Sequence, residues 1–393
     1  MISQLSFITT FILLIWGLTI LFNQLTSEQM EPTSIKDKDI LAKRIIPELP
    51  KKMKIGYANW GECDEKIFEA VQNGLNTIIW FSVDLSSNPQ THRPEITRGP
   101  NYQDVAKMIK RFRDNGYNII NLLSIGGWNT PHPDTAHSGK EYFEAWLELN
   151  RKISNEELEF YGFDGFDWDI EGNDDFKSTH NHFTFAELDV MGEMSKLAKE
   201  KGYIISMAPA ESYLDTTTNA FSLSLLHNHP EWEKEVPKFT YHGRNAYAYL
   251  LAKYGVDTFD FISVQLYEGY SHTLYMYSRE KKDFGSILAK YINAYESGYE
   301  VDFTMEKGSG LEKVLIKIPK EKIVIGLANA WATKQFIFID EDSILQGYKD
   351  LKKGGLDCRG FMYWDIADEG KIHPDDKEKK EFYMSKVLNK LFE

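Results

Sequence analysis

The amino-acid sequence predicts an α/β protein, a closed (β/α)8 TIM barrel preceded by an N-terminal hydrophobic segment and a short linker. From about residue 52 onward, short apolar runs alternate with helical periods, and the alternation occurs eight times. Strands that alternate with helices form a parallel sheet, and eight such units favour a closed barrel. The length of 393 residues fits one barrel. No Gly-x-Gly-x-x-Gly or P-loop run opens a helix, which argues against an open dinucleotide-binding sheet.

Three segments are expected along the chain. Residues 1–26 contain an apolar run, residues 5–25, that is just long enough to span a bilayer, so we interpret it as a signal peptide or a membrane anchor. Residues 27–50 are charged and interrupted by Pro32, Pro47 and Pro50, and we interpret them as a polar linker. Residues 51–393 form the barrel. We therefore expect a secreted or membrane-anchored protein whose barrel is extracellular or lumenal.

Eight short runs are the strand candidates, and helical spacing lies between them. In chain order the strands are expected at 53–59, 77–83, 119–125, 162–170, 203–208, 259–266, 322–328 and 360–364. Two helices show the i, i+3, i+4, i+7 spacing most clearly, one through Val105, Met108, Ile109 and Phe112 and one through Leu188, Met191, Met194 and Leu197. A final helix is expected over roughly 376–391.

The fourth strand candidate carries the most informative pattern, Asp167-Trp168-Asp169-Ile170-Glu171. Because side chains alternate along a strand, the three acids share one face and the apolar residues share the other. Like charges about 6–7 Å apart cannot all ionise at low cost, so we expect a shared proton and proton chemistry on this face. A calcium site is the alternative, but calcium loops prefer turns rich in Asn, Gly and Asp to an aromatic strand.

Composition limits the partners. The formal net charge of −14 argues against nucleic acid, and a neutral substrate fits better. The pairs His180/His182 and His227/His229 have no further clustered ligands, so no metal or other cofactor is expected. Cys63 follows the first strand and Cys358 precedes the eighth, which places them at opposite ends of the barrel, too far apart for a disulfide. We expect two free thiols and a monomer.

Barrel chemistry occurs at the carboxyl ends of the strands, and several of these ends carry polar or aromatic side chains. Glu171 ends the fourth strand and therefore lies at the mouth, with Asp169 below it and Asp167 deeper. The other strand ends contribute candidate substrate contacts, which are Tyr57, Trp60, Gly127, Trp128, Met207, Gln265, Tyr267 and Trp364. Each is weak evidence by itself, but together they predict a binding site around the acidic strand.

These residues make the sequence similar to the chitinases of glycoside hydrolase family 18. The family signature, Asp-Gly-x-Asp-x-Asp-x-Glu on the fourth strand, is present as Asp164, Gly165, Asp167, Asp169 and Glu171. The family's Ser-x-Gly-Gly motif on the third strand corresponds to Ser124, Gly126 and Gly127, and its later tyrosine and tryptophan correspond to Tyr267 and Trp364. The resemblance extends over nearly all of residues 53–390.

The resemblance implies endo-acting, retaining hydrolysis of chitin, a β-1,4-linked N-acetylglucosamine polymer. Glu171 would be the general acid, and Asp169 and Tyr267 would orient the substrate's acetamido group. Asp167 would share a proton with Asp169, and Trp364 would form the floor under the sugar at the cleavage point. In this family the nucleophile is the substrate's own N-acetyl oxygen rather than a second carboxylate. Trp60 and Trp128 would line the groove.

The chain departs from the family pattern at two places. Glu268 follows the strand-six tyrosine, where the family has Asp or Asn, and the roughly thirty residues between strands seven and eight, 329–359, leave room for one helix and no α+β insertion. The groove walls must then come from segments 211–243 and 268–281, with Tyr270, Tyr275 and Tyr277. An open groove of this kind favours endo-cleavage.

Two other functions share the motif. An endo-β-N-acetylglucosaminidase that cuts the core of N-glycans uses the same acidic strand and the same substrate-assisted chemistry. A non-hydrolytic chitin-binding lectin uses the same barrel, but such relatives typically lose the terminal glutamate or its Asp partner, and both are present here as Glu171 and Asp169.

Overall fold

The structure, a computed structural model, describes residues 40–45, 47–58, 63–226, 243–269, 271–334 and 336–393. The chain divides into two units, Met1–Arg44 and Ile45–Glu393. Within the first unit the structure describes residues 40–44, which begin with a short helical turn. The predicted hydrophobic segment at 5–25 lies outside the described residues. Within the described ranges, no helix is both long enough and apolar enough to cross a membrane.

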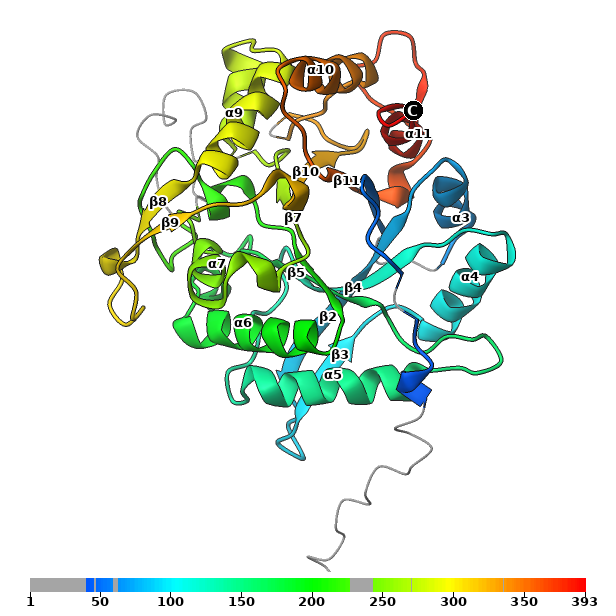
Figure 1. The fold of residues 1–393 in the computed structure, drawn as a ribbon, viewed down its shortest axis with the longest axis vertical. Coiled ribbons are helices and arrows are strands. Elements are labelled where there is room, and N and C mark those ends of the chain that lie inside the picture. The colour runs from blue at the N-terminus through cyan, green and yellow to red at the C-terminus, as the bar shows by residue number, and fades with distance from the viewer. Residues whose placement is uncertain (1–39, 46, 59–62, 227–242, 270, 335) are drawn as a thin grey trace, which may run out of the picture. The chain divides into compact units, whose positions relative to one another are not determined.

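Eight parallel strands of the second unit close into a barrel, as the sequence predicted (Figure 1). The barrel closes because β1 pairs with both β2 and β11. In chain order the barrel strands are β1 (Met53–Ala58), β2 (Thr77–Ser87), β4 (Ile120–Gly127), β5 (Gly165–Ile170), β6 (Ile204–Met207), β7 (Phe261–Gln265), β10 (Ile323–Ala328) and β11 (Gly360–Trp364). Every predicted strand run overlaps one of them, with ends that differ by a few residues.

Helices surround the barrel and cover the outer face of its strands (Figure 1). The longer ones are α3 (Glu65–Gln72), α4 (Tyr102–Asp114), α5 (Gly139–Ile153), α6 (Phe185–Glu200), α7 (Ala248–Tyr254), α9 (Phe284–Ser297), α10 (Glu341–Lys353) and α11 (Met384–Lys390). Side chains fix where two of them begin, because Ser138 with Glu141 and Thr184 with Glu187 form capping boxes at α5 and α6. The predicted final helix is wrong at its start. Residues 381–382 form strand β13, which pairs with β12 (Lys371–Ile372), so α11 begins only at Met384.

Two layers of apolar side chains follow from the alternation along the strands. One layer fills the barrel interior and includes Ile55, Phe81, Leu122, Phe261 and Met362. The other lies between the strands and the helices and includes residues of the opposite parity, such as Phe166 and Trp168 of β5. Because successive side chains of a strand point to opposite faces, one residue of register decides which layer a side chain joins.

Two hairpins were not predicted. Strand β3 (Pro94–Arg98) pairs antiparallel with the long end of β2, and β8 (Tyr299–Asp302) pairs with β9 (Lys313–Ile316) between α9 and β10. The connection from β10 to β11 contains α10, in agreement with the single helix expected there.

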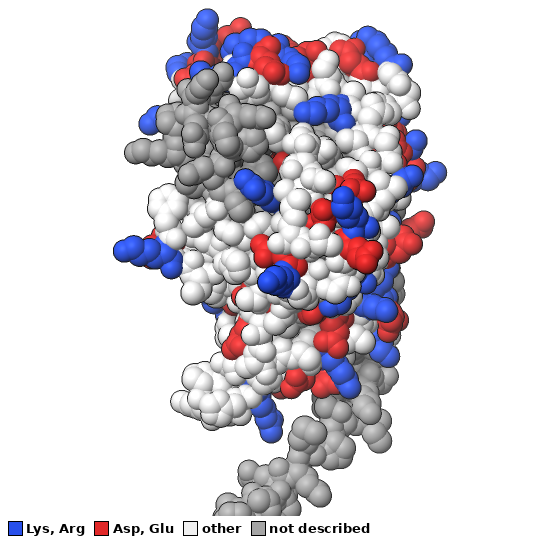
Figure 2. Space-filling model, turned by 90° about the vertical axis from the view of Figure 1, so that its left-hand side faces the viewer, with Lys and Arg blue, Asp and Glu red and all other residues white. Residues whose placement is uncertain are grey.

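Both cysteines are free thiols, as predicted. Charged side chains on the face that carries α6, α7 and the β8–β9 hairpin are interspersed, with acidic and basic groups side by side (Figure 2). On the described part of this face, neither sign of charge forms one continuous patch.

Candidate active site

Strand β5 places its three acids on the inner face of the barrel, as the alternation predicted. Asp167, Asp169 and Glu171 are 0%, 5% and 6% exposed, and Trp168 between them belongs to the outer apolar layer. The acids therefore form a buried column that rises from the barrel interior to the carboxyl ends of the strands. Burial opposes ionisation of all three groups.

Asp167, the deepest acid, is held by two hydroxyl groups. The Tyr57 hydroxyl donates to Oδ2 and the Ser206 hydroxyl donates to Oδ1, each at 2.5 Å. Ser206 is its partner in the neighbouring strand, because β5 and β6 pair with Asp167 opposite Ser206. Burial raises the pKa of Asp167 to about 7, although both hydroxyl groups act in the opposite direction.

Asp169, the middle acid, is held by Gln265 at the end of β7. The Gln265 amide donates at 2.9 Å to Asp169 Oδ1 and at 2.7 Å to the carbonyl oxygen of Ala208. Burial raises the pKa of Asp169 well above its ordinary value, and the charges of Glu171 and Asp167 add to this effect. Within the described residues, Asp167 and Asp169 make no hydrogen bond to each other, because Asp167 is bonded to Tyr57 and Ser206 and Asp169 to Gln265.

Glu171, the outermost acid, has one carboxyl oxygen without a hydrogen-bond partner in the described part of the chain. Its Oε1 is buried and has no hydrogen-bond partner among the described residues. Burial raises the pKa of Glu171 well above its ordinary value, and the charge of Glu268 adds to this effect. Glu268 is itself 6% exposed, and burial together with the charge of Asp169 raises its pKa to about 8. Burial and the charge of Glu268 therefore both favour the protonated form of Glu171, and its Oε1 is available to a substrate.

Aromatic rings lie beside the acids. Trp364, at the end of β11, packs against Tyr57 and Phe81, with ring centroids 5.6 and 4.8 Å apart. Tyr267 packs edge-on against Trp331 at 6.0 Å, and the Trp331 indole donates at 2.7 Å to the carbonyl oxygen of Trp364. Burial raises the pKa of the Tyr267 hydroxyl, and the negative charges of Glu268, Glu171 and Asp169 add to this effect. The structure therefore brings Tyr267 and Trp364 to the acid column, as predicted.

Close packing explains the glycines of the two motifs. A Cβ atom on Gly165 would lie 1.7 Å from the carbonyl oxygen of Ile204, and one on Gly127, whose φ is +121°, would lie 2.2 Å from the Phe81 ring. Asp164 has a structural position at the other end of β5, where its Oδ2 accepts at 2.8 Å from the Asn121 amide. Asp164 and Gly165 therefore set the strand in place.

One predicted contact, Met207, is not brought to the acids. Met207 belongs to the outer layer, since its neighbour Ser206 faces inward to Asp167. Trp60 lies outside the described residues. Trp128 is close to the site, because its ring lies over Gly172 and its indole donates at 3.0 Å to Asp174 in the loop that follows Glu171.

Sequence reasoning missed Ser206 as a site residue and assigned no role to Glu268. The signal for Ser206 was a polar residue inside the apolar run of β6. Ser206 lies two residues from Ile204 and therefore shares its inward face, whereas Met207 points outward. The signal for Glu268 was an acid directly after the strand-six tyrosine, which was noted only as a departure. Its effect on Glu171 depends on distance and burial in the folded chain.

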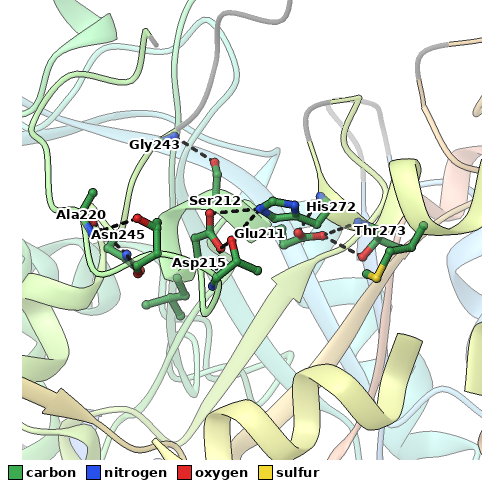
Figure 3. A network of polar contacts seen from close by, with 12 residues as sticks. Glu211, Ser212, Asp215, Ala220, Gly243, Asn245, His272 and Thr273 are labelled. Carbon is green, nitrogen blue, oxygen red and sulfur yellow. Dashed lines mark hydrogen bonds and ion pairs between the residues drawn. The ribbon is translucent and has the colours of Figure 1, made fainter. Parts of the chain in front are cut away.

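Two loops beside the site are joined by the polar network in Figure 3. Glu211, after β6, accepts from the amides of His272 and Thr273 and from the Thr273 hydroxyl, at 2.7, 3.1 and 2.7 Å. Asp215 pairs with His272 at 3.3 Å. Burial alone would lower the pKa of His272, but Asp215 and Glu211 raise it above its ordinary value. Of the predicted wall segments, 227–242 and Tyr270 lie outside the described residues.

The donor set suits proton transfer. Across the described ranges, no group of three or more His, Cys, Asp or Glu side chains is placed to hold a metal ion. The site offers at the mouth a carboxyl whose pKa is raised by burial, below it a carboxyl fixed by an amide, and aromatic faces to the side. This arrangement can donate a proton to a substrate oxygen and can stack on an apolar ring face.

Comparisons with known proteins support the fold. No family model matches the sequence, and the curated proteins give no significant match. Among solved structures, the chain is similar to a family 18 chitinase from Chromobacterium violaceum, with a TM-score of 0.55, 14% identity and coverage of 89% of this chain and 85% of that one. It is also similar to a fungal endo-β-N-acetylglucosaminidase of glycosyl hydrolase family 18, with a TM-score of 0.51, 11% identity and coverage of 88% and 98%. The chain has the fold of glycoside hydrolase family 18.

Proposed function

We propose that this protein is a glycoside hydrolase that cleaves chitin and its soluble oligosaccharides within the chain, by a retaining, substrate-assisted mechanism with Glu171 as general acid. The observation that carries the proposal is the Glu171 carboxyl, which is buried, has a pKa raised by its surroundings and is unbonded at Oε1. A general acid must hold its proton until the substrate takes it, and this carboxyl is arranged to do so.

The first step transfers the Glu171 proton to the glycosidic oxygen as the bond to the anomeric carbon breaks. The acetamido oxygen of the same sugar attacks that carbon, and the resulting cyclic cation takes the place of a covalent enzyme intermediate. Asp169 and Tyr267 orient the acetamido group, and Trp364 supports the sugar ring. Water then attacks the anomeric carbon from the face that the leaving group occupied, and Glu171 accepts its proton. This attack opens the ring formed by the acetamido group, so the product retains the β configuration.

The positions of Asp167 and Gln265 fit this scheme. Gln265 fixes one oxygen of Asp169, and the other oxygen remains for the substrate. Asp167 takes hydroxyl hydrogen bonds on both oxygens, which keeps it as a fixed group beneath Asp169. Burial and the negative charges of Glu171 and Asp167 raise the pKa of Asp169. The raised pKa favours a proton between Asp169 and the acetamido nitrogen.

A second candidate function is endo-β-N-acetylglucosaminidase activity on N-glycans. It is favoured by the likeness to the fungal enzyme of that activity, which extends over 98% of that chain. The two activities share the acids and differ in the sugars beyond the cleavage point. We also propose that the protein acts as a monomer and is secreted or membrane-anchored through residues 5–25, on the strength of the apolar run there.

The test compares three substrates at equal concentration: N-acetylchitohexaose, cellohexaose and a high-mannose glycopeptide. Chitin cleavage predicts internal cuts in the first, no cuts in the second, which lacks the acetamido nucleophile, and none in the third. Cleavage of the glycopeptide alone would support the second function. Cleavage of cellohexaose, or of no substrate, would contradict the proposal.

A further inference from the structure

A buried histidine contacts the main-chain carbonyl of Glu171. His132, in the loop after β4, places Nε2 at 2.9 Å from the carbonyl oxygen of Glu171, and its side chain is completely buried. Pro131 and Pro133 flank His132 and restrict the backbone on both sides of it. The catalytic carboxyl and this carbonyl belong to the same residue, so a shift of one moves the other.

The imidazole ring itself is fixed on several sides. On the opposite side of the ring, Nδ1 lies 3.5 Å from Oε2 of Glu187 and makes no hydrogen bond among the described residues. Glu187 is held in turn at the start of α6, where its Oε2 accepts at 2.5 Å from the Thr184 amide. Phe183 stacks on the ring at 4.4 Å, and the His132 amide donates to Nδ1 of His180 at 3.2 Å. Nε2 thus faces the carbonyl oxygen of Glu171, and packing against Phe183 sets the ring plane.

No strand among the described residues supplies this support. Strand β6 ends at Met207, and β4 ends opposite Ile170, so the backbone of residues 171–173 extends beyond the sheet ladder. Side chains and loop amides replace the missing pairing. The Tyr247 hydroxyl bonds both the amide and the carbonyl of Ile170, at 2.8 and 2.9 Å, and the Asn129 amide donates to the carbonyl of Gly172 at 3.0 Å. Between these contacts, the carbonyl of Glu171 has His132 as its donor.

We propose that His132 is a positioning residue for Glu171: its Nε2–H fixes the carbonyl of the acid, and the contacts with Phe183 and His180 hold the ring in place. A carbonyl oxygen can only accept a hydrogen bond, so this contact requires the hydrogen on Nε2 of His132. The inference rests on the proposed function in that Glu171 is taken to be the acid. It adds a residue to that function which does not touch the substrate.

Two variants separate the ring's two contacts. The side-chain amide of His132→Gln can reach the position of Nε2 and keeps the donor to Glu171, whereas that of His132→Asn reaches the position of Nδ1 and loses it. On N-acetylchitohexaose, His132→Asn should lower kcat by about 10- to 100-fold with KM little changed, the scale expected for a catalytic group displaced by about 1 Å. His132→Gln should retain most of kcat.

The control is His373→Asn. His373 is also buried, its Nε2 lies 2.8 Å from the carbonyl oxygen of Ala332, and Phe338 stacks on its ring. This variant should lower the thermal midpoint as His132→Asn does, with kcat unchanged. The proposal is overturned if His132→Asn keeps its kcat, if His132→Gln loses as much as His132→Asn, or if His373→Asn loses kcat to the same extent.

A second measurement decides the proposal if the wild-type protein cleaves no N-acetylglucosamine oligosaccharide, an outcome that would refute the proposed function alone. The ¹³C resonance of the Glu171 carboxyl, assigned with Glu171→Gln, should move in His132→Asn and stay in place in His132→Gln. An unmoved resonance in His132→Asn would overturn the positioning role.

Discussion

At the scale of single residues, the site contains a carboxyl group whose surroundings favour its protonated form. Glu171 is buried beneath the mouth of the barrel, and Glu268 and Asp169 lie close enough to repel its negative form. Desolvation and like charges both favour the protonated acid, and they act together here. The Gln265 amide acts in the opposite direction on both Asp169 and Glu171, and burial outweighs it.

Glu171→Gln tests the acid directly. Glutamine has the same shape and cannot donate a proton of useful acidity, so kcat on N-acetylchitohexaose should fall by at least about 10²-fold, the low end for general acid catalysis. Oligosaccharide binding, measured by calorimetry, should persist because the aromatic contacts remain. Equal kcat in the variant and the wild type would assign the acid to another residue.

Glu268→Gln tests the raised pKa of Glu268 through the pH dependence of the free energy of unfolding. The pKa of Glu268 rises from 4.5 to about 8 on folding, so between these values the folded protein holds a proton that the unfolded chain has lost. The free energy of unfolding therefore falls as pH rises from 4.5 to 8. Glu268→Gln should reduce this fall by at least about 1.4 kcal/mol, the equivalent of one pKa unit.

The measurement is urea unfolding at pH 5 and pH 8. Asp167, whose pKa is about 7, contributes a fall of the same sign that remains in the variant. The exposed Glu157 provides the matched control, and Glu157→Gln should leave the difference between the two pH values as in the wild type. An unchanged difference in Glu268→Gln would show that Glu268 does not titrate in this way.

At the scale of elements, strand β5 shows what the sequence could predict. Its alternation required one face of acids and one of apolar residues, and the structure has both. In β6 the same reasoning pointed to Met207, although Ser206 faces inward, because an apolar strand buried on both faces has no alternation that reveals its register. The contact between His132 and Glu171 joins residues 39 apart, and no local pattern indicates it.

Gly165→Ala tests the packing of β5 against β6. The added Cβ would lie 1.7 Å from the carbonyl oxygen of Ile204, so the two strands would have to separate. We expect the free energy of unfolding to fall by about 3 kcal/mol or more, the upper range for overpacking in a core. Urea unfolding monitored by tryptophan fluorescence measures the change.

Gly354→Ala is the matched control for that substitution. Gly354 has φ of −72° at the end of α10, and its added Cβ would lie no closer than 3.3 Å to another atom. Alanine there should leave stability unchanged or raise it by up to about 1 kcal/mol. Equal losses in both variants would contradict the packing argument.

At the scale of the whole molecule, the barrel could be predicted because its signal repeats. Eight strand and helix pairs give eight chances to detect one pattern, and an error of two residues at one end does not change the count. The β2–β3 and β8–β9 hairpins occur once each and interrupt that pattern. Sequence reasoning therefore identified the eight strands and the acids, and it missed the hairpins and the contacts from Ser206 and His132.

The likeness to solved structures fixes the fold, and the chemistry must be measured. The central claim is that the acetamido oxygen of the substrate, and not water, attacks the anomeric carbon after Glu171 donates its proton. Attack by the neighbouring group followed by water gives two inversions at that carbon, whereas direct attack by water gives one.

Proton NMR of the first products from N-acetylchitohexaose, recorded within minutes of mixing and before the anomers equilibrate, tests this claim most directly. The account predicts that the newly formed reducing ends appear as the β-anomer and change slowly to the equilibrium mixture. Initial release of the α-anomer would contradict it.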